Sequence, residues 1–277
     1  MNGKLYLVAT PIGNLEDITF RAIRILKEVD FIAAEDTRNT LKLLNYYEIK
    51  KPLFSYHRHN EDLKKSDIIE KLKDGKNIAV VSDAGTPGIS DPGEVVVKEA
   101  IKENIEVIPI PGACAAINAL ICSGLDTNEF SFYGFLPLNK KLRNEKLEEI
   151  QNETKTAIIY EAPHKLENTL KDLKEILNER KVVIARELTK IHEEFIRGTV
   201  NEIADKARDL KGEIIILIEG AEVQKKENYL NNLSLEEHYS FYEKQGLNKK
   251  EIIKKIAKDR GVNKNEIYIK FINKIKK

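Results

Sequence analysis

The chain alternates short apolar runs with longer segments in which apolar side chains recur every three or four positions. The first pattern is typical of buried strands and the second of amphipathic helices. Strands are predicted over residues 5–9, 31–34, 77–81 and 106–110. Helices are predicted over residues 20–29, 94–102 and 113–121. This order predicts an α/β domain with a largely parallel sheet, in which the loops that follow the strands face a ligand crevice.

A second set of strand patterns predicts a second α/β domain. Its strands are predicted over residues 130–133, 156–160, 182–185, 194–198 and 213–219, with helices between them. The polar residues 221–232 show no periodicity and predict a linker.

The last part of the chain predicts a separate helical unit. Ser234 and Glu237 have the spacing of a capping box, and Asn248 precedes an apolar helical pattern that runs through Ala257. Three short helices of this kind fit a helix-turn-helix or any other small helical bundle. We therefore predict an N-terminal α/β domain, a C-terminal α/β domain, a linker and a helical extension, at residues 1–112, 113–222, 223–233 and 234–277.

The formal net charge of +1 hides an uneven distribution of charge. Residues 234–277 contain 12 Lys and Arg against 6 Asp and Glu, whereas the other 233 residues contain 34 basic and 39 acidic side chains. A nearly neutral body with a basic extension is consistent with contact between the extension and a polyanion, but a lysine-rich surface that only aids solubility has the same composition.

Composition and the first residues of the chain indicate the broad class of protein. No uninterrupted apolar run approaches the roughly 18 to 20 residues that a membrane span needs. Residues 1–10 lack the basic start and apolar stretch of a secretory signal. We therefore expect a cytoplasmic protein without a membrane partner. The two cysteines, Cys114 and Cys122, are expected to pack in the core, and no metal site is predicted.

Two loops that follow predicted strands are the first candidates for chemistry. Residues 10–14 are Thr-Pro-Ile-Gly-Asn, and residues 82–93 contain three glycines and two prolines. Such a loop is rigid and lets its backbone approach a ligand closely, while Asp83 offers a carboxylate acceptor. Either loop alone is also typical of an ordinary tight crossover. Neither loop matches a dinucleotide-binding or phosphate-binding glycine motif. A nicotinamide dinucleotide or a nucleoside triphosphate is therefore not indicated as a ligand.

Three further segments follow later strands. Residues 110–116 bring small side chains to a helix start, residues 160–165 place a proline in a first helical turn, and residues 185–190 carry alternating charges. Each has an ordinary structural interpretation: a packed helix start, a cap with His164 at the surface, and a salt-bridged turn.

Taken together and in order, these segments resemble the tetrapyrrole-methylase superfamily, and within it the branch of small-subunit ribosomal RNA methyltransferases. The resemblance covers about residues 4–220 and rests on VATPIGNLEDIT, AAEDTRNT, VSDAGTPGISDPG, PGACAAINAL, FYGFLP, YEAPHKL, ARELTK and KGEIIILIEG. One motif would be unspecific, whereas the ordered set is specific. It implies two α/β domains of the class III methyltransferase type, with a cofactor cleft between them and a small helical extension.

The resemblance also implies the activity and its cofactor, namely S-adenosylmethionine-dependent 2′-O-methylation of a cytidine ribose in 16S ribosomal RNA. It implies a small-ribosomal-subunit partner and a homodimer. The residues that the resemblance assigns to the cofactor are Pro11, Asp83, Ala84, Gly85, Ile89, Cys114, Ala115, Tyr160, Glu161, Arg186 and Glu187.

The acceptor side is harder to predict because positioning dominates methyl transfer and a general base is optional. Asp36, His57 and His59 are the candidate bases, Arg38 is a candidate clamp on phosphate and Asn60 a candidate polar contact to substrate. For each histidine the alternative is an ordinary surface residue.

Two other functions remain open on the sequence. A tetrapyrrole or corrin C-methyltransferase would use the same cofactor cleft, although the EDTR and RELTK segments and the basic tail argue against it. A non-catalytic RNA-binding module for ribosome assembly would bind neither the cofactor nor its demethylated product.

Overall fold

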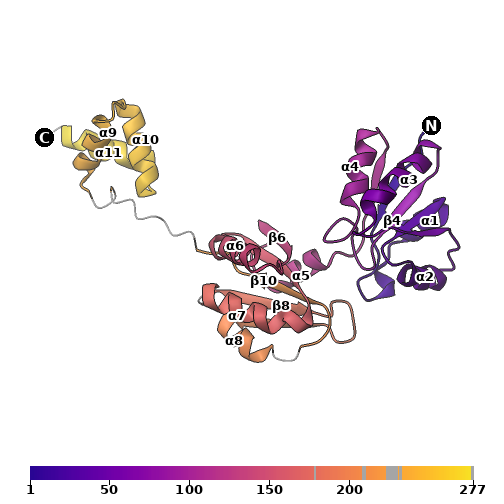
Figure 1. Ribbon diagram of the computed structural model, residues 1–277. Helices are drawn as coiled ribbons and strands as arrows, with labels where there is room; N and C mark the ends of the chain where they lie inside the picture. The colour runs from indigo at the N-terminus through magenta and orange to yellow at the C-terminus, as the bar shows by residue number, and fades with distance from the viewer. Residues whose placement is uncertain (178, 208–209, 223–229, 231–232, 276–277) are drawn as a thin grey trace. The chain divides into compact units, whose positions relative to one another are not determined.

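The computed structural model describes residues 1–177, 179–207, 210–222, 230 and 233–275 (Figure 1). It divides into two compact units, residues 1–221 and residues 222–277. The larger unit contains two five-stranded sheets, and helices make up the regular structure described in the smaller one. The two-domain α/β fold class and the helical end of the chain are confirmed. The individual domain boundaries predicted above stay predictions.

The first sheet has the strand order β3-β2-β4-β1-β5, and all its pairs are parallel. Its strands are β1 (Leu5–Val8), β2 (Phe31–Ala34), β3 (Leu53–Ser55), β4 (Ile78–Val81) and β5 (Val107–Ile110). Its helices are α1 (Phe20–Glu28), α2 (Thr37–Tyr46), α3 (Glu61–Lys73) and α4 (Glu94–Lys102). Because the strands are parallel, the loops that follow them gather at one edge of the sheet.

Successive side chains of the central strands point to opposite faces of the sheet, which explains why helices cover both faces. On β4, Ala79 and Val81 belong to a core cluster with side chains of α1 and α2, whereas Ile78 and Val80 pack with side chains of α3 and α4. A strand that is apolar on both faces needs helices on both, which gives a helix–sheet–helix sandwich.

The second sheet has the order β6-β7-β10-β8-β9, with one parallel pair, β6 with β7, and antiparallel pairs elsewhere. Its strands are β6 (Phe130–Phe135), β7 (Thr156–Glu161), β8 (Lys181–Arg186), β9 (Glu194–Thr199) and β10 (Ile214–Ile218). The helices are α5 (Ala115–Ser123), α6 (Lys140–Asn152), α7 (Leu166–Leu177) and α8 (Val200–Lys206).

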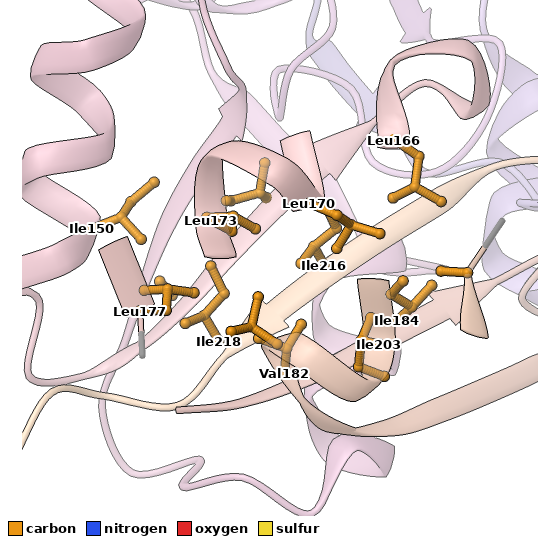
Figure 2. Packing of buried hydrophobic residues seen from close by; sticks show 14 of the residues in the cluster. Ile150, Leu166, Leu170, Leu173, Leu177, Val182, Ile184, Ile203, Ile216 and Ile218 are labelled. Carbon is orange, nitrogen blue, oxygen red and sulfur yellow. The ribbon is translucent and has the colours of Figure 1, made fainter. Parts of the chain in front are cut away.

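The two faces of the second sheet have different cores. Leu170 and Leu173 of α7 lie against Ile216 of β10 and its neighbours on one face (Figure 2). The opposite face packs against α5 and also receives Ile12, which comes from the loop after β1. This contact joins the edge of the first sheet where the loops gather to the second sheet.

The smaller unit contains α9 (Leu235–Glu243), α10 (Lys249–Arg260) and α11 (Lys264–Ile275) around its own apolar cluster. The predicted capping box of Ser234 with Glu237 is confirmed, and Asn248 forms a second one with Glu251. Most of the predicted linker lies outside the described residues. No described helix is both long and apolar enough to span a bilayer.

Candidate active site

The loops after β1 and β4 are joined to each other by a short backbone bridge. The amide of Thr10 donates to the carbonyl of Gly85 at 2.9 Å, and the amide of Gly85 donates back to the carbonyl of Thr10 at 3.1 Å. Gly85 has φ of +83°, and a Cβ there would lie 3.1 Å from Ile12. Only glycine adopts this backbone conformation readily, so both the conformation and the lack of space for a side chain favour glycine at position 85.

The rest of the β4 loop is held in place from several sides. The Thr86 hydroxyl donates to the carbonyl of Ala113 at 3.0 Å, which ties the loop to the start of α5. The Arg58 guanidinium donates to the carbonyl of Ser90, whose φ is +63°. The loop therefore presents a preorganised surface to the adjoining space.

A cavity of about 370 Å³ lies between these loops and the second sheet. Its apolar wall includes Ile12, Ile89, Leu188 and Ile215. The remaining lining residues are Ala84, Gly85, Thr86, Ser90, Asp91, Cys114, Ala115, Phe135, Tyr160, Glu161, Ala162, Pro163, Gly212, Glu213 and Ile214. A mostly apolar cleft with a few polar groups is typical of a small-molecule or cofactor site.

A second cavity of about 370 Å³ shares Ile12, Ala84 and Glu213 with the first. Its other lining residues are Thr10, Pro11, Gly13, Leu15, Asn39, Thr40, Lys42, Leu43, Tyr46, Ser82, Asp83 and Lys190. The Thr40 hydroxyl is buried without a hydrogen-bond partner in the described part of the chain. This cavity lies over α2 and the β1 and β4 loops.

Nine of the predicted cofactor residues lie on these two cavities. Pro11 and Asp83 line the second, Ala84 lines both, and the others line the first, namely Gly85, Ile89, Cys114, Ala115, Tyr160 and Glu161. They come from the loops after β1 and β4, the start of α5 and the end of strand β7, and the order of motifs alone does not show that these segments meet.

Arg186 and Glu187 line neither of these cavities. The Arg186 guanidinium pairs with Glu194 at 2.7 Å, and the Glu187 carboxylate pairs with Lys190 at 2.9 Å. The Glu187 side chain also accepts from the amide of Glu213, a cavity residue, at 2.9 Å. Glu187 thus holds the backbone of a cavity residue, whereas Arg186 pairs with strand β9.

The candidate bases Asp36, His57 and His59 do not line either cavity. Asp36 caps α2 and pairs with Arg38 at 2.7 Å, and hydrogen bonds from Arg38 lower the pKa of its carboxyl to about 2. A carboxylate so strongly stabilised is a weak proton acceptor at neutral pH. The rings of His57 and His59 lie 6.0 Å apart, and the buried Nδ1 of His57 has no partner in the described chain.

The two candidate substrate contacts have different environments. The Arg38 side chain is 87% exposed, although Asp36 engages its guanidinium. The amide of Asn60 instead closes a local turn, accepting from the amide of His57 at 2.8 Å and donating to the carbonyl of Ser55 at 3.3 Å. Arg38 is therefore available at the surface, whereas the Asn60 side chain supports the loop before α3.

Sequence reasoning missed two carboxylates, Glu35 and Asp91, of which Asp91 lines the first cavity. Burial and the neighbouring Asp83 charge raise the pKa of Glu35, with burial the larger effect. Burial, reinforced by the Glu35 charge, raises the pKa of Asp91 to about 7. Asp91 lies inside the SDPG segment of the β4 loop, but only the fold shows that Glu35 comes close to it.

The two cysteines do not both pack as expected. Cys114 is partly buried beside the first cavity, but Cys122 is exposed near the end of α5, so the expectation of core packing was wrong for Cys122. The apolar period of α5 places residue 122 on the outer face of the helix, which the spacing of eight alone did not reveal. Within the described residues no cluster of three or more potential metal ligands occurs.

Comparison with known proteins gives near full-length matches. Residues 4–204 match the family model for tetrapyrrole (corrin/porphyrin) methylases. The chain is 54% identical over 270 residues to ribosomal RNA small subunit methyltransferase I of Halalkalibacterium halodurans, covering 96% of this chain and 93% of that protein. It is 51% identical over 271 residues to the protein of the same name from Bacillus subtilis, with the same coverages.

A solved structure agrees at the level of the fold. Uroporphyrin-III C-methyltransferase from Thermus thermophilus, complexed with S-adenyl homocysteine, matches with a TM-score of 0.57 and 14% identity over 78% of this chain and 97% of that chain. The resemblance inferred from the ordered motifs is confirmed, and the chain belongs to the tetrapyrrole (corrin/porphyrin) methylase family.

Proposed function

We propose that the protein uses S-adenosylmethionine to methylate the 2′-hydroxyl of a cytidine ribose in 16S ribosomal RNA, in the cytoplasm. The observation that carries this proposal is the 54% identity, over nearly the whole of both chains, to a ribosomal RNA small subunit methyltransferase I. The match covers 96% of this chain, so it is not confined to one part of it.

The first cavity fits the proposed cofactor by shape and chemistry. Ile12, Ile89, Leu188 and Ile215 offer an apolar wall for a purine ring, and the absent side chain of Gly85 leaves room at the turn. Carboxylates at the cavity suit the positive charge of a sulfonium. The residues proposed to hold the cofactor are Pro11, Asp83, Ala84, Gly85, Ile89, Cys114, Ala115, Tyr160 and Glu161, with Arg186 and Glu187 in support.

When bound, the cofactor would supply a methyl group made electrophilic by its sulfonium, without a metal. The chain's own contribution is to orient the acceptor oxygen and exclude water, and such positioning is worth roughly 7 to 11 kcal/mol. Tyr160 is fixed for this task, because its hydroxyl accepts from the amide of Ala116 at 3.1 Å and burial raises its pKa to about 12. It is therefore a neutral wall of the site and not a proton acceptor.

On the substrate side, we propose that Arg38 contacts phosphate and that Asn60 supports the substrate-facing loop. The smaller unit adds phosphate attraction, because α10 carries exposed Lys250, Lys254 and Lys258 at helical spacing along one face. Sequence-specific recognition of RNA usually targets an exposed nucleotide, which suits a cavity better than a charged surface.

We propose a homodimer, supported by apolar side chains that the described chain leaves exposed on α5 and β6. Ile117 and Ile121 are 40% and 64% exposed, and Phe130 and Phe132 are 40% and 36% exposed. Exposed apolar groups of this size mark interaction surfaces. Sedimentation of the chain should show a dimer, and Ile121→Lys should shift it toward monomer. A monomer at micromolar concentration would contradict the proposal.

Mass mapping of 16S RNA tests the proposed activity. RNA from cells lacking the protein should lose one 2′-O-methylcytidine, and the intact gene should restore it. A corrin C-methyltransferase would leave the RNA unchanged and methylate a porphyrinoid. If the protein were a non-catalytic assembly module, its intact gene would restore subunit assembly but no methyl group. A gene with altered cavity residues would restore assembly equally well.

A further inference from the structure

The second cavity borders the proposed cofactor site but differs from it in charge. Ile12, Ala84 and Glu213 line both cavities, so the occupants of the two would be neighbours. The first cavity is lined by three carboxylates, and no Lys or Arg belongs to its described lining. The second is lined by two carboxylates and by two lysines, Lys42 and Lys190. The first cavity therefore suits a cationic group, whereas the second has cations that an anionic group could meet.

Both carboxylates and one lysine of the second cavity are engaged within the protein. Asp83 accepts from the amide of Asp36 at 3.0 Å and from the side chain of Asn39 at 3.1 Å. Glu213 pairs with Lys190 at 3.3 Å. These bonds hold the wall of the cavity together and leave the other lysine for a ligand.

That lysine is Lys42, on the helix α2 that forms one side of the cavity. Its side chain is exposed and donates to the side-chain oxygen of Asn39 at 3.5 Å. Among the described residues it has no ion pair. Arg38 lies one helical turn before it, so α2 places two cations on neighbouring turns of one face. A phosphate at the mouth of the cavity would meet both.

Tyr46 gives the same cavity an exposed aromatic ring. It lies one turn after Lys42 on α2, lines the cavity and is 63% exposed. Its ring makes an edge-to-face contact with the ring of Tyr47, with the centroids 4.9 Å apart. The Tyr47 hydroxyl donates to the carbonyl of Leu15, another residue of the cavity, which anchors the pair of rings to the segment after β1. An exposed aromatic ring beside a cation is a typical platform on which proteins stack an unpaired base of RNA.

The cavity also contains a buried polar group without a partner. Thr40 lines the cavity and is 4% exposed, and its hydroxyl has no hydrogen-bond partner in the described part of the chain. Buried hydroxyls are rarely left unpaired, because desolvation without a hydrogen bond is costly. A polar group of a bound ligand would satisfy this hydroxyl. Leu43, one turn further along α2, adds an apolar contact for a flat ring.

We propose that the second cavity binds the acceptor nucleotide of the RNA, with its base stacked on Tyr46, its phosphate paired with Lys42 and a polar group of the nucleotide bonded to the Thr40 hydroxyl. This inference rests on the proposed function. Methyl transfer requires the acceptor oxygen to lie within about 3 to 3.5 Å of the methyl carbon. A cavity that shares lining residues with the cofactor cavity is where this requirement can be met. The aromatic, cationic and polar groups of the cavity match the base, phosphate and ribose of one nucleotide.

The first arm of the test measures methyl transfer to small subunits that lack the modification, at saturating S-adenosylmethionine. Tyr46→Ala should raise the KM for the subunit by about 10-fold or more, because the stacking platform is lost. Tyr46→Phe should keep the parent KM, because the ring remains. The affinity of both variants for S-adenosylhomocysteine should stay within about twofold of the parent, since Tyr46 does not line the first cavity. A folded Tyr46→Ala with the parent KM, or one that loses S-adenosylhomocysteine affinity instead, would overturn the proposal.

The second arm measures subunit binding across a salt series. Lys42→Ala should weaken binding and lower the slope of log affinity against log salt concentration by about 0.7 to 0.9, as expected for the loss of one phosphate contact. Tyr46→Ala should weaken binding without changing this slope, because it removes no charge. Lys50→Ala is the matched control, since it removes the same charge from an exposed position just after α2 that lines neither cavity. Equal slopes for Lys42→Ala and Lys50→Ala would contradict the phosphate contact.

The third arm identifies the neighbour of Tyr46 by ultraviolet cross-linking and mass spectrometry. In the complex of the parent protein, S-adenosylhomocysteine and the unmodified small subunit, the acceptor cytidine should cross-link to the peptide that contains Tyr46. A cytidine linked to another segment of residues 1–221, with none linked to Tyr46, would overturn the proposal.

The outcomes separate the inference from the function on which it rests. Parent-like KM and salt slope in folded Tyr46→Ala and Lys42→Ala, with active parent protein, remove the nucleotide site and leave the proposed function standing. Absence of transfer by the parent protein on every unmodified subunit contradicts the proposed function, while the cross-link still reports whether RNA enters the second cavity.

Discussion

At the scale of single residues, carboxylates of similar sequence context have different tasks. Asp36, Asp83 and Asp91 each follow or lie within a loop at the same edge of the first sheet. Asp36 caps a helix, Asp83 joins two loops, and Asp91 faces the cavity. The sequence favoured Asp36 as a base because composition cannot distinguish a capped carboxylate from an unpaired one. The surroundings of Asp91 depend on residues distant in the sequence, such as Glu35.

Asp83→Ala is expected to weaken binding of S-adenosylhomocysteine by about 10-fold or more while the protein stays folded. The substitution removes the two hydrogen bonds that hold the β2 and β4 loops, each worth roughly 1 to 3 kcal/mol for a charged acceptor. Calorimetric titration, with Asp62→Ala as control, checks this. A folded variant that binds as tightly as its parent would show that Asp83 does not shape the cofactor site.

Asp91 should also make the free energy of unfolding depend on pH. Its pKa is raised in the folded protein from 3.8 to about 7, so the folded state holds its proton more tightly and the free energy of unfolding falls as pH rises through this window. Asp91→Asn should remove that loss. Because the side chain keeps solvent contact, we expect a gain of only about 1 kcal/mol at pH 8 and none at pH 3. Denaturant unfolding at both pH values measures it, and an equal effect at both would contradict the assigned pKa.

At the scale of elements, periodicity predicted those strands and helices that bury a full face. Strand β4 is buried at every position, and α1 is strongly amphipathic, so both were predicted within about one residue. Elements α2, β3 and α3 were not assigned. Strand β3 has only three residues, all partly buried, and α3 has a weak apolar pattern dominated by Glu and Lys. Their place depends on pairing and packing with β2 and α4, which are contacts distant in the sequence.

The β6 strand and its neighbours show a second limit of sequence analysis. The strand patterns predicted the second α/β domain, but period alone cannot distinguish parallel from antiparallel pairing. Only one pair in that sheet is parallel. Likewise, nine of the eleven residues assigned to the cofactor line the cavities, whereas the ion pairs of Arg186 and Glu187 required the structure.

Within the smaller unit, His238 joins α9 to α10 and should be essential to its packing. The ring is fully buried and contacts the carboxylate of Asp259 at 3.1 Å and the guanidinium of Arg260 at 3.2 Å. His238→Ala should destabilise this unit by about 2 to 4 kcal/mol through cavity formation and lost hydrogen bonds. Hydrogen exchange should quicken on α9 and α10 while the two sheets stay protected. Unchanged exchange on both helices would contradict this role.

At the scale of the whole molecule, the two units divide the proposed task. The larger unit holds both cavities, and the smaller unit carries the excess of basic side chains. The uneven distribution of charge is visible in the sequence alone, because 12 basic residues of 44 stand out against a nearly neutral body. The sequence pattern does not predict an angle or a distance between the two units.

Removal of residues 234–277 should leave S-adenosylhomocysteine affinity within about twofold of the parent and weaken binding to the small subunit. The truncation removes 12 Lys and Arg and 6 Asp and Glu, so the salt dependence of binding should become shallower as well. Filter binding across a salt series measures both. Equal subunit affinity and equal salt slope for the two proteins would reduce the unit to a role in solubility or assembly.

The most direct test of the central claim replaces the acceptor ribose with 2′-deoxyribose at the cytidine identified by mass mapping, within otherwise identical reconstituted small subunits. This change removes the 2′-oxygen and preserves the base, so any base methylation would persist. We expect full methyl incorporation with the ribose subunit and none with the deoxyribose subunit. Undiminished incorporation into the deoxyribose subunit would contradict ribose methylation by this protein.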